Sequence, residues 1–346
     1  MDMFMKESAK ALVSVIITTY HNEGYLPRAI ESILHQSYPE IEVIVVDDNP
    51  PESRERRETE KIMSRYPQAV YMKHPENRNG AAARNTGIAA ARGKYIAFLD
   101  NDDFYFTSHI TDCVRVLETH PDCGCVLCSV VKVCEGLCWD LVHAPSGDMV
   151  KTLLFSETAL GTGSNLFVRA ELVRKIHGFD ESFQRHQDVE FGLRLFSRCR
   201  TYSLDEVQIV KEMGGFSNAP DYERFFKTKY QLWRKFQAEI NALTEDEKNR
   251  YFSRQFSALL YTACKGKNKE QIKRTIQELK KYRPLNGKEK LLVILSRFHL
   301  FVMYEEMKKI IKRIKSPKIY EKTVQHGTPY DVQILQKALC DGKKGR

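Results

Sequence analysis

The sequence predicts an α/β fold, with a central sheet and helices on both of its faces, followed by a mainly helical and basic region. Short apolar strands alternate with helical patterns through the first hundred residues, and polar side chains follow those strands three times. The charge is uneven, because residues 1–220 contain 24 Lys and Arg against 31 Asp and Glu, whereas residues 221–346 contain 30 against 14. We therefore predict two regions, 1–220 and 221–346, with different partners.

Strand and helix patterns follow one another in the first region. Runs rich in β-branched residues predict strands, and apolar residues at helical spacing predict helices. The strands are expected at residues 12–18, 41–46, 70–72 and 95–99, and the helices at 26–34, 52–65 and 80–91. This alternation indicates parallel strands joined by right-handed crossovers. In such sheets a ligand binds beyond the carboxyl ends of the strands.

Those carboxyl ends carry polar side chains in this sequence. Residues 18–23 follow the first strand, Asp47 and Asp48 the second, and residues 100–103 (Asp-Asn-Asp-Asp) the strand at 95–99. Three carboxylates within four positions repel one another, and a divalent cation with oxygen ligands relieves that repulsion. An acidic turn is the simpler interpretation of the last segment alone. Three polar strand ends in a row favour a ligand site.

The sequence lacks the phosphate-binding motifs of two other classes of α/β enzyme. The first strand–helix turn lacks G-x-G-x-x-G and the chain lacks G-x-x-x-x-G-K-[ST], which disfavours a dinucleotide-dependent dehydrogenase or a P-loop enzyme. Residues 79–85 offer another device, with small residues at a helix start and Arg84 able to bind phosphate oxygens. Taken alone, this segment is better explained as a capped, Ala-rich helix.

A second candidate group lies at residues 184–195. Asp188 is expected to open a helix whose apolar face contains Val189, Leu193 and Phe196. A carboxylate at a helix N-terminus stays ionised at neutral pH, which suits a general base and equally suits a plain N-cap. His186 is a rival base.

The nine cysteines are expected to be free thiols in a reducing cytoplasm, because residues 1–7 do not resemble a secretory signal. Five of them lie within residues 123–138, where valines and a leucine separate them. A buried core strand explains this pattern better than a metal site does, since the spacing is tighter than in zinc modules.

Taken together, several segments resemble the inverting family-2 glycosyltransferases with the GT-A fold, of the bacterial surface-polysaccharide type. The resemblance covers roughly residues 12–215, and its motifs follow the family's order. The matching segments are residues 14–20, 45–48, 80–85, 93–103 and 178–188. It implies a Rossmann-like mixed sheet in residues 1–220 as the catalytic domain, and acceptor, membrane or oligomer contacts for residues 221–346.

The resemblance also implies roles for single residues. Thr18 and Asp48 would contact the nucleotide base, with Asp48 accepting from a uracil ring N–H, and Glu23 and Arg84 would lie around the ribose and diphosphate. Asp100 would lie near the ribose. Asp102 would hold Mn²⁺ or Mg²⁺ on the diphosphate, Asp188 would be the catalytic base, and Asp103 would be structural. Tyr20 and Asn101, inside the matched motifs, complete the expected nucleotide-sugar-binding set.

The sequence departs from the family pattern at three places. His21 stands where Asn is usual, residues 49–51 (Asn-Pro-Pro) replace the usual Gly-Ser, and Gln187 precedes Asp188 where Glu is commoner. The first two departures lie in the loop expected on the base side of the nucleotide, and the third lies on the acceptor side.

The predicted function is metal-dependent transfer, with inversion, of a sugar from a nucleotide-sugar, with a UDP-sugar favoured. The acceptor would be a hydroxyl of a glycan or polyprenyl-linked molecule in capsule, lipopolysaccharide or exopolysaccharide assembly. A sugar-nucleotide nucleotidyltransferase and a non-catalytic glycosyltransferase-like binding module are the alternatives. The first would need a Gly-rich, Lys- or Arg-bearing loop after the first strand, which is missing. No nucleic-acid partner is expected.

The basic region contains one informative stretch, residues 288–315, which predicts a basic amphipathic helix. Its apolar run is shorter than the ~20 residues that span a bilayer. Such a helix either lies on an anionic membrane surface or packs on its own domain. The expected location is therefore the cytoplasm, with peripheral attachment to the inner face of the membrane as one alternative.

Overall fold

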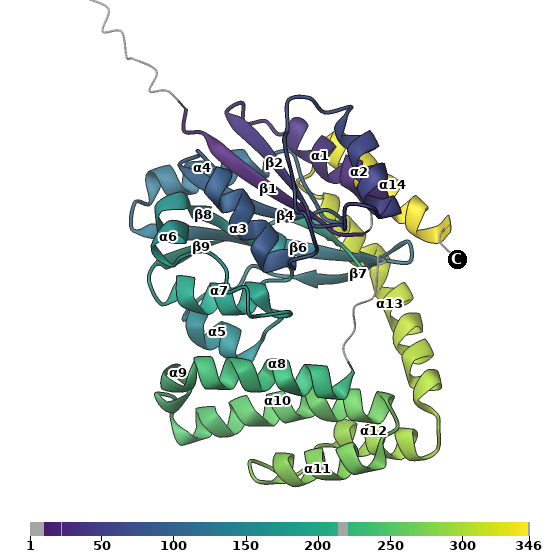
Figure 1. Ribbon diagram of the computed structural model, residues 1–346. Coiled ribbons are helices and arrows are strands. Elements are labelled where there is room, and N and C mark those ends of the chain that lie inside the picture. Colours follow the sequence, from purple (N-terminus) through teal and green to yellow (C-terminus); the bar gives the residue numbers. More distant parts are fainter. Residues whose placement is uncertain (1–9, 22, 214–220, 345–346) are drawn as a thin grey trace, which may run out of the picture.

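The computed structural model describes residues 10–21, 23–213 and 221–344, without the side chains of Glu23 and of residues 343 and 344. Figure 1 shows a twisted sheet with helices on both faces, and a further group of helices beyond those that cover one face. One long helix, α13 (Phe301–Val324), leads from that group back to the sheet.

Within the described residues the sheet has nine strands, in the order β3-β2-β1-β4-β8-β6-β9-β5, with β7 paired to β6. Their bounds are β1 Val13–Thr19, β2 Ile41–Asp47, β3 Val70–Lys73, β4 Tyr95–Asp100, β5 Phe104–Tyr105, β6 Cys123–Cys134, β7 Leu137–Val142, β8 Phe167–Arg169 and β9 Arg200–Glu212. Strands β3, β2, β1 and β4 are parallel, whereas β8 runs antiparallel to β4 and to β6. The predicted mixed α/β sheet is confirmed, and each strand expected before residue 100 is present.

The parallel register brings the polar strand ends together. Thr18 on β1 lies beside Asp100 on β4 and beside Val46 on β2, and Thr19 pairs with Asp47. The three polar segments therefore meet at one edge of the sheet, as parallel strands require.

Two hydrophobic layers hold helices against the sheet. One contains alternate β1 and β4 residues such as Ile16 and Phe98 and packs against α3, α5, α6 and α7; the other contains Val15 and Leu99 and packs against α1, α2 and α4. The alternation of side chains along a strand supplies both layers. The bounds are α1 Leu26–Leu34, α2 Arg54–Met63, α3 Gly80–Ala90, α4 His109–Thr119, α5 Met149–Phe155, α6 Ala170–Lys175 and α7 Gln187–Phe196, with short 3-10 turns at Glu23–Tyr25 and Gly163–Asn165.

The basic region is divided between two environments. Helices α8 (Tyr222–Lys235), α10 (Glu245–Lys265), α11 (Lys269–Lys280) and α12 (Gly287–Arg297) share a hydrophobic core of their own, and the short α9 (Gln237–Asn241) packs against the sheet-side layer. Helices α13 and α14 (Pro329–Lys344) instead return to the sheet, where Ile334, Leu335 and Ala338 pack with Val131 and Val133 of β6. The last two helices are thus part of the packing of the sheet.

The prediction of one helix over residues 288–315 was wrong. A turn at residues 298–300 separates α12 from α13, and His299 in this turn adopts a left-handed backbone conformation with φ of 60°. The apolar spacing continues across this turn, which is why the sequence suggested one element. The turn is fixed by tertiary contacts, since Leu292 and Phe301, on either side of it, pack into the same core as α10.

Candidate active site

The acidic segment lies at the end of β4, where the chain turns toward β5. Carboxylate oxygens of Asp100, Asp102 and Asp103 all lie within 4.8 Å of one another. Asp103 is fully buried and accepts hydrogen bonds from the hydroxyls of Thr162 (2.6 Å) and Ser164 (2.7 Å). Asp103 therefore ties the acidic turn to the loop before β8 and has the structural role that the sequence suggested.

Asp102 differs from its neighbours because no described residue forms an ion pair or side-chain hydrogen bond with its carboxylate. Burial, followed by the charges of Asp103 and Asp100, raises its pKa to about 8. The Arg28 guanidinium donates instead to the backbone carbonyl of Asp102 (3.1 Å) and to Glu212 (3.3 Å), which holds the turn in place. A partly exposed carboxylate that lacks a cation, beside two other carboxylates, fits a hard divalent ion such as Mn²⁺ or Mg²⁺.

Arg84 joins the acidic segment to the helix that contains Asp188. From α3 its guanidinium donates to Asp100 (2.6 Å) and to the side-chain carbonyl of Gln187 (2.9 Å). Burial raises the pKa of Asp100, but the charges of Arg84 and Lys211 outweigh it and leave that pKa below its ordinary value. Gly163 adjoins both side chains, since a Cβ there would stand 3.5 Å from the Asp188 Cβ and 3.8 Å from the Arg84 Nη2, at ordinary contact distances. The predicted Arg84, Asp100 and Asp188 thus share one site.

Asp188 is the second residue of α7, and its Oδ1 accepts from the Val189 N–H (3.0 Å). The N-cap is His186, in a left-handed conformation (φ 56°), so the alternative of Asp188 as the N-cap is wrong. The rival base His186 has its Nδ1 3.1 Å from the Glu157 carboxylate, which also pairs with Lys229. Asp188 itself lines a cavity of about 640 Å³ that continues toward α10.

Asp48 is 2% exposed, and donors surround both of its oxygens. Oδ1 accepts from the His74 ring (2.7 Å) and the Arg78 N–H (2.9 Å), and Oδ2 from the Asn77 amide (2.9 Å) and the Asn79 N–H (2.9 Å). A carboxylate has about four lone-pair positions, so these donors fill them. Asp48 therefore holds the loop that leads into α3, and its contact with a base stays a prediction.

The other predicted donor residues lie near the same edge. Asn101 is buried and donates to the Thr19 hydroxyl (2.9 Å) and the His21 carbonyl (2.9 Å), which links β4 to the turn after β1. Thr18 is half-buried, and Tyr20 leaves 45% of its surface exposed with its ring edge-on to His21. The side chain of Glu23 lies outside the described part of the structure.

The sequence reasoning missed Lys211, which ends β9 beside the acidic segment. Its ammonium lies 3.3 Å from the Thr162 hydroxyl. Burial lowers its pKa, but the charges of Asp103, Asp100, Asp102 and Asp188 raise it far more, so Lys211 stays charged. The one local signal was a lysine at the end of an apolar strand pattern, 111 positions after Asp100. Only the pairing of β9 with β5 and β6 brings them together.

The cysteine-rich segment forms β6, as predicted, and all nine cysteines are free. The Sγ atoms of Cys128 and Cys113 lie 3.9 Å apart in the core. The His109 Nδ1 lies 3.7 Å from the Cys128 Sγ and 3.8 Å from the Cys113 Sγ. All three side chains are fully buried in the core.

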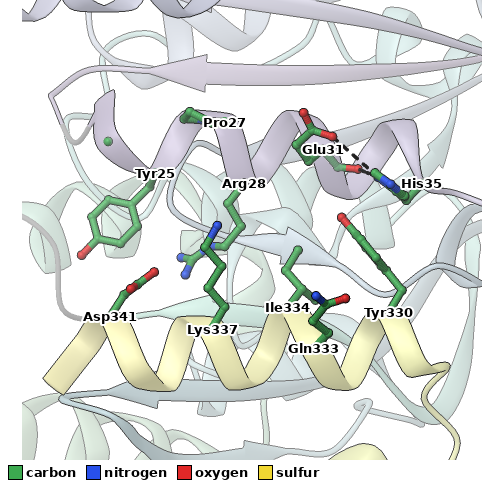
Figure 2. A pocket seen from close by; sticks show the side chains of 11 residues that line it. Tyr25, Pro27, Arg28, Glu31, His35, Tyr330, Gln333, Ile334, Lys337 and Asp341 are labelled. Carbon is green, nitrogen blue, oxygen red and sulfur yellow. Dashed lines mark hydrogen bonds and ion pairs between the residues drawn. The ribbon is translucent and has the colours of Figure 1, made fainter. Parts of the chain in front are cut away.

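Figure 2 shows the cavity behind the acidic segment, of about 660 Å³, between α1 and α14. Arg28, which binds the Asp102 carbonyl, projects from α1 toward Lys337 and Ile334 on α14. The C-terminal helix therefore covers the side chain that holds the acidic turn.

Comparison with known proteins shows what this chain resembles. Residues 14–176 match the model of the family described as glycosyl transferase family 2. An uncharacterized glycosyltransferase of Rickettsia bellii is 26% identical over 242 residues, which are 68% of this chain and 34% of that protein. One of Methanocaldococcus jannaschii is 28% identical over 212 residues, 59% of this chain and 71% of that protein. This chain thus spans about a third of the length of the Rickettsia bellii relative.

The fold is also found in solved structures. The crystal structure of TarS 1–349 from S. aureus is 17% identical and covers 97% of this chain and 92% of that one, with a TM-score of 0.57. The structure of the same protein in complex with UDP-GlcNAc gives a TM-score of 0.59 over the same shares. The predicted α/β fold of GT-A type is thereby confirmed. Residues 14–176, just under half of the chain, thus resemble glycosyl transferase family 2.

Proposed function

We propose that this protein is a metal-dependent inverting glycosyltransferase that moves a sugar from a nucleotide-sugar, with a UDP-sugar favoured, to a hydroxyl of a glycan or lipid-linked acceptor. Assembly of a surface polysaccharide is the setting that such an acceptor suggests. One observation carries the proposal: Arg84 binds both Asp100, beside the carboxylate that lacks a cation, and Gln187, beside Asp188. A metal-binding group and a candidate base therefore face one site from two elements.

The donor side is built at the ends of β1, β2 and β4. Asp102 would hold Mn²⁺ or Mg²⁺, with Asp100 nearby, and the ion would neutralise the diphosphate leaving group as a Lewis acid. Arg84 and Lys211 add two fixed positive charges where negative charge grows on that leaving group. The exposed ring of Tyr20, with Thr18 beside it, would receive the base, and Asn101 and Asp48 would hold the loops around it.

The acceptor side contains the base. Asp188 would accept the proton of the attacking hydroxyl while that oxygen bonds to the anomeric carbon and the nucleoside diphosphate leaves. A single displacement with one base inverts the anomeric centre and needs no nucleophilic side chain. His186, whose Nδ1 lies 3.1 Å from the Glu157 carboxylate, is the rival base, and comparison of Asp188→Asn with His186→Asn separates the two.

Titration calorimetry with a panel of UDP- and GDP-sugars, with and without Mn²⁺, tests the donor assignment. The TarS complex contains UDP-GlcNAc, which makes that sugar nucleotide the first candidate. We expect Mn²⁺-dependent binding of a UDP-sugar. Absence of binding for every UDP-sugar in the panel, or binding that ignores the metal, would contradict the proposal.

We further propose that residues 291–314 place the enzyme on an anionic membrane surface. Ten large apolar side chains in this stretch are at least 41% exposed, including Phe298, Met303, Met307 and Ile314. Arg313 and Lys315 lie near the apolar row on α13, roughly 100° to either side by helical geometry, and form no ion pair with a described residue. An apolar row between cations suits the interface of an anionic bilayer better than a second, equally basic copy. None of the described helices is apolar enough over its length to cross a bilayer.

The membrane proposal is tested by changing the exposed row and leaving the packing intact. We expect Met303→Gln, Met307→Gln, Ile310→Gln and Ile314→Gln together to abolish co-sedimentation with vesicles containing about 30% phosphatidylglycerol. Leu34→Gln, Val70→Gln and Tyr230→Gln, at exposed apolar positions elsewhere, form the control. Unchanged vesicle binding would refute the proposal, as would loss of a dimer without loss of vesicle binding. Deleting α13 and α14 is unsuitable, because both pack against the sheet.

A further inference from the structure

The cavity that contains Asp188 continues into a second one between the helices of the basic region. The first cavity, of about 640 Å³, is lined from the sheet by Thr162 and Lys211 and from α10 by Arg254 and Gln255. The second, of about 910 Å³, lies between α10 and α12 and is called the cationic cavity below. The two share the side chains of Arg185, Phe225, Arg254 and Ala258. An acceptor whose hydroxyl reaches Asp188 therefore has a continuous path along α10.

The charges that line the cationic cavity are strongly unbalanced. Its lining contains five basic side chains and a single acid, Glu289, which is already bound by Arg283 (2.6 Å). The others are Arg185, Arg254, Lys265 and Lys288. Of these, Arg254, Lys265 and Lys288 are exposed and form no ion pair with any described residue. In contrast, Lys229 in the first cavity is buried against Glu157, so that positive charge is already neutralised.

A second observation indicates a polar ligand at the junction. Gln255 is 3% exposed and lines the first cavity, and its side-chain carbonyl accepts no hydrogen bond from a described residue. A buried amide oxygen without a donor costs roughly 1–3 kcal/mol unless a ligand or water satisfies it. A hydroxyl of a bound sugar or polyol would supply that donor close to Asp188.

From these features we infer that the acceptor carries phosphate groups, which bind in the cationic cavity at Arg254, Lys265 and Lys288 while an acceptor hydroxyl lies between Gln255 and Asp188. Arg supplies a fork and Lys a point charge to phosphate oxygens. The inference rests on the proposed function, because Asp188 defines which cavity receives the acceptor. It adds that the basic region selects the acceptor class, whereas the sheet edge selects the donor.

The test compares two variants of equal charge. The cavity variant is Arg254→Gln, Lys265→Gln and Lys288→Gln; the control is Lys269→Gln, Lys273→Gln and Lys280→Gln, three exposed lysines of α11 that line neither cavity and form no ion pair with a described residue. Both lose three positive charges, so a difference between them reports position and not net charge. All six side chains lie on the surface, and equal melting temperatures would confirm that both variants are folded.

The probes are sodium polyphosphate of about 20 units, polygalacturonate of similar length, and phosphatidylcholine vesicles with 5% farnesyl phosphate, each in EDTA. We expect the cavity variant to bind polyphosphate or the vesicles at least about tenfold more weakly than the control at ~50 mM salt, with a flatter salt dependence. A loss confined to polyphosphate indicates a phosphate-containing chain as the source, and a loss confined to vesicles indicates a lipid phosphate. Equal binding by both variants would overturn the inference, as would a larger loss for the carboxylate polymer.

A separate measurement distinguishes failure of this inference from failure of the proposed function. Mn²⁺-dependent UDP binding is expected to be unchanged in both variants, because none of the six positions lies at the ends of β1, β2 or β4. If wild-type protein bound no UDP, the proposed function would fail. The polyphosphate comparison would then still decide whether the cationic cavity binds phosphate.

Discussion

Replacing Asp188 by Asn tests the assigned base with little disturbance of the site. Asn has the same shape and keeps an oxygen for the Val189 N–H, which Asp188 Oδ1 accepts at 3.0 Å. The contacts of Arg84 with Asp100 and Gln187 do not involve the Asp188 carboxylate. Lys211 keeps its three neighbouring acids at the strand end. The substitution therefore removes the proton acceptor and little else.

General base catalysis contributes roughly 10²–10⁴-fold, so kcat for Asp188→Asn should fall by that factor, equivalent to about 3–5 kcal/mol in the activation barrier. The assay is release of UDP from the tightest-binding UDP-sugar of the panel at saturating donor and Mn²⁺. The Kd for UDP should change less than about twofold, because the base lies on the acceptor side.

The rival base provides the matched control. Asn tolerates the left-handed backbone conformation that His186 adopts, so His186→Asn should leave the backbone unchanged. We expect this substitution to lower kcat by less than tenfold. Full activity in Asp188→Asn would refute the assignment of the base. A loss in His186→Asn equal to that in Asp188→Asn would refute the choice of Asp188 over His186 as the base.

Three further predictions concern the metal, a buried ion pair and the packing of the sheet. Asp102→Asn should abolish the Mn²⁺ dependence of UDP binding in calorimetry, whereas Asp122→Asn, at an exposed site, should keep it. Glu157→Gln should lower the free energy of unfolding by about 3–5 kcal/mol, because Lys229 is 3% exposed and would lose its partner; Glu245→Gln, 83% exposed, is the control. Burial opposes ionisation of Glu157, but His186 and Lys229 lower its pKa to about 2, so its stabilisation is complete above about pH 4.5 and is lost as the pH falls toward 2. In acid denaturation, the wild type should therefore lose more stability than Glu157→Gln over that range. Gly87→Ala should cost about 1–3 kcal/mol in urea unfolding, because the added Cβ would stand 2.3 Å from the Ile16 Cγ2, whereas Gly287→Ala, which meets no atom within 4 Å, should cost nothing.

Much of the region that forms the sheet could be predicted from the sequence, because strand and helix signals are local. Each strand from β1 to β4 has a short apolar run, and the helices between them have apolar residues at regular spacing. Parallel pairing then places Thr18, Asp48 and Asp100 at one edge without knowledge of any side-chain contact. The structural role of Asp103 was predictable for a similar reason, since one of three crowded carboxylates must find buried donors.

The sequence could not show which donors satisfy each carboxylate. Asp48 looks the same as a ligand-binding Asp in the sequence, yet His74 and the loop at residues 77–79 fill its lone pairs. Lys211 belongs to the site only because β9 pairs with β5 at the far side of the sheet. Such contacts join residues 26 to 111 positions apart, and no local pattern records them.

The sequence by itself determined the α/β sheet, its acidic edge and the excess of positive charge after residue 220, because periodicity and composition are properties of the chain. Only the tertiary structure decided where that charge acts. In the tertiary structure, residues 288–315 form two helices, and α13 and α14 pack against the sheet. Arg254, Lys265 and Lys288 lie beside the path to Asp188 and have no acidic partner among the described residues. The physical reason is that a charge is neutralised by its neighbours in space. Those neighbours are determined by the packing of segments that are distant in the sequence.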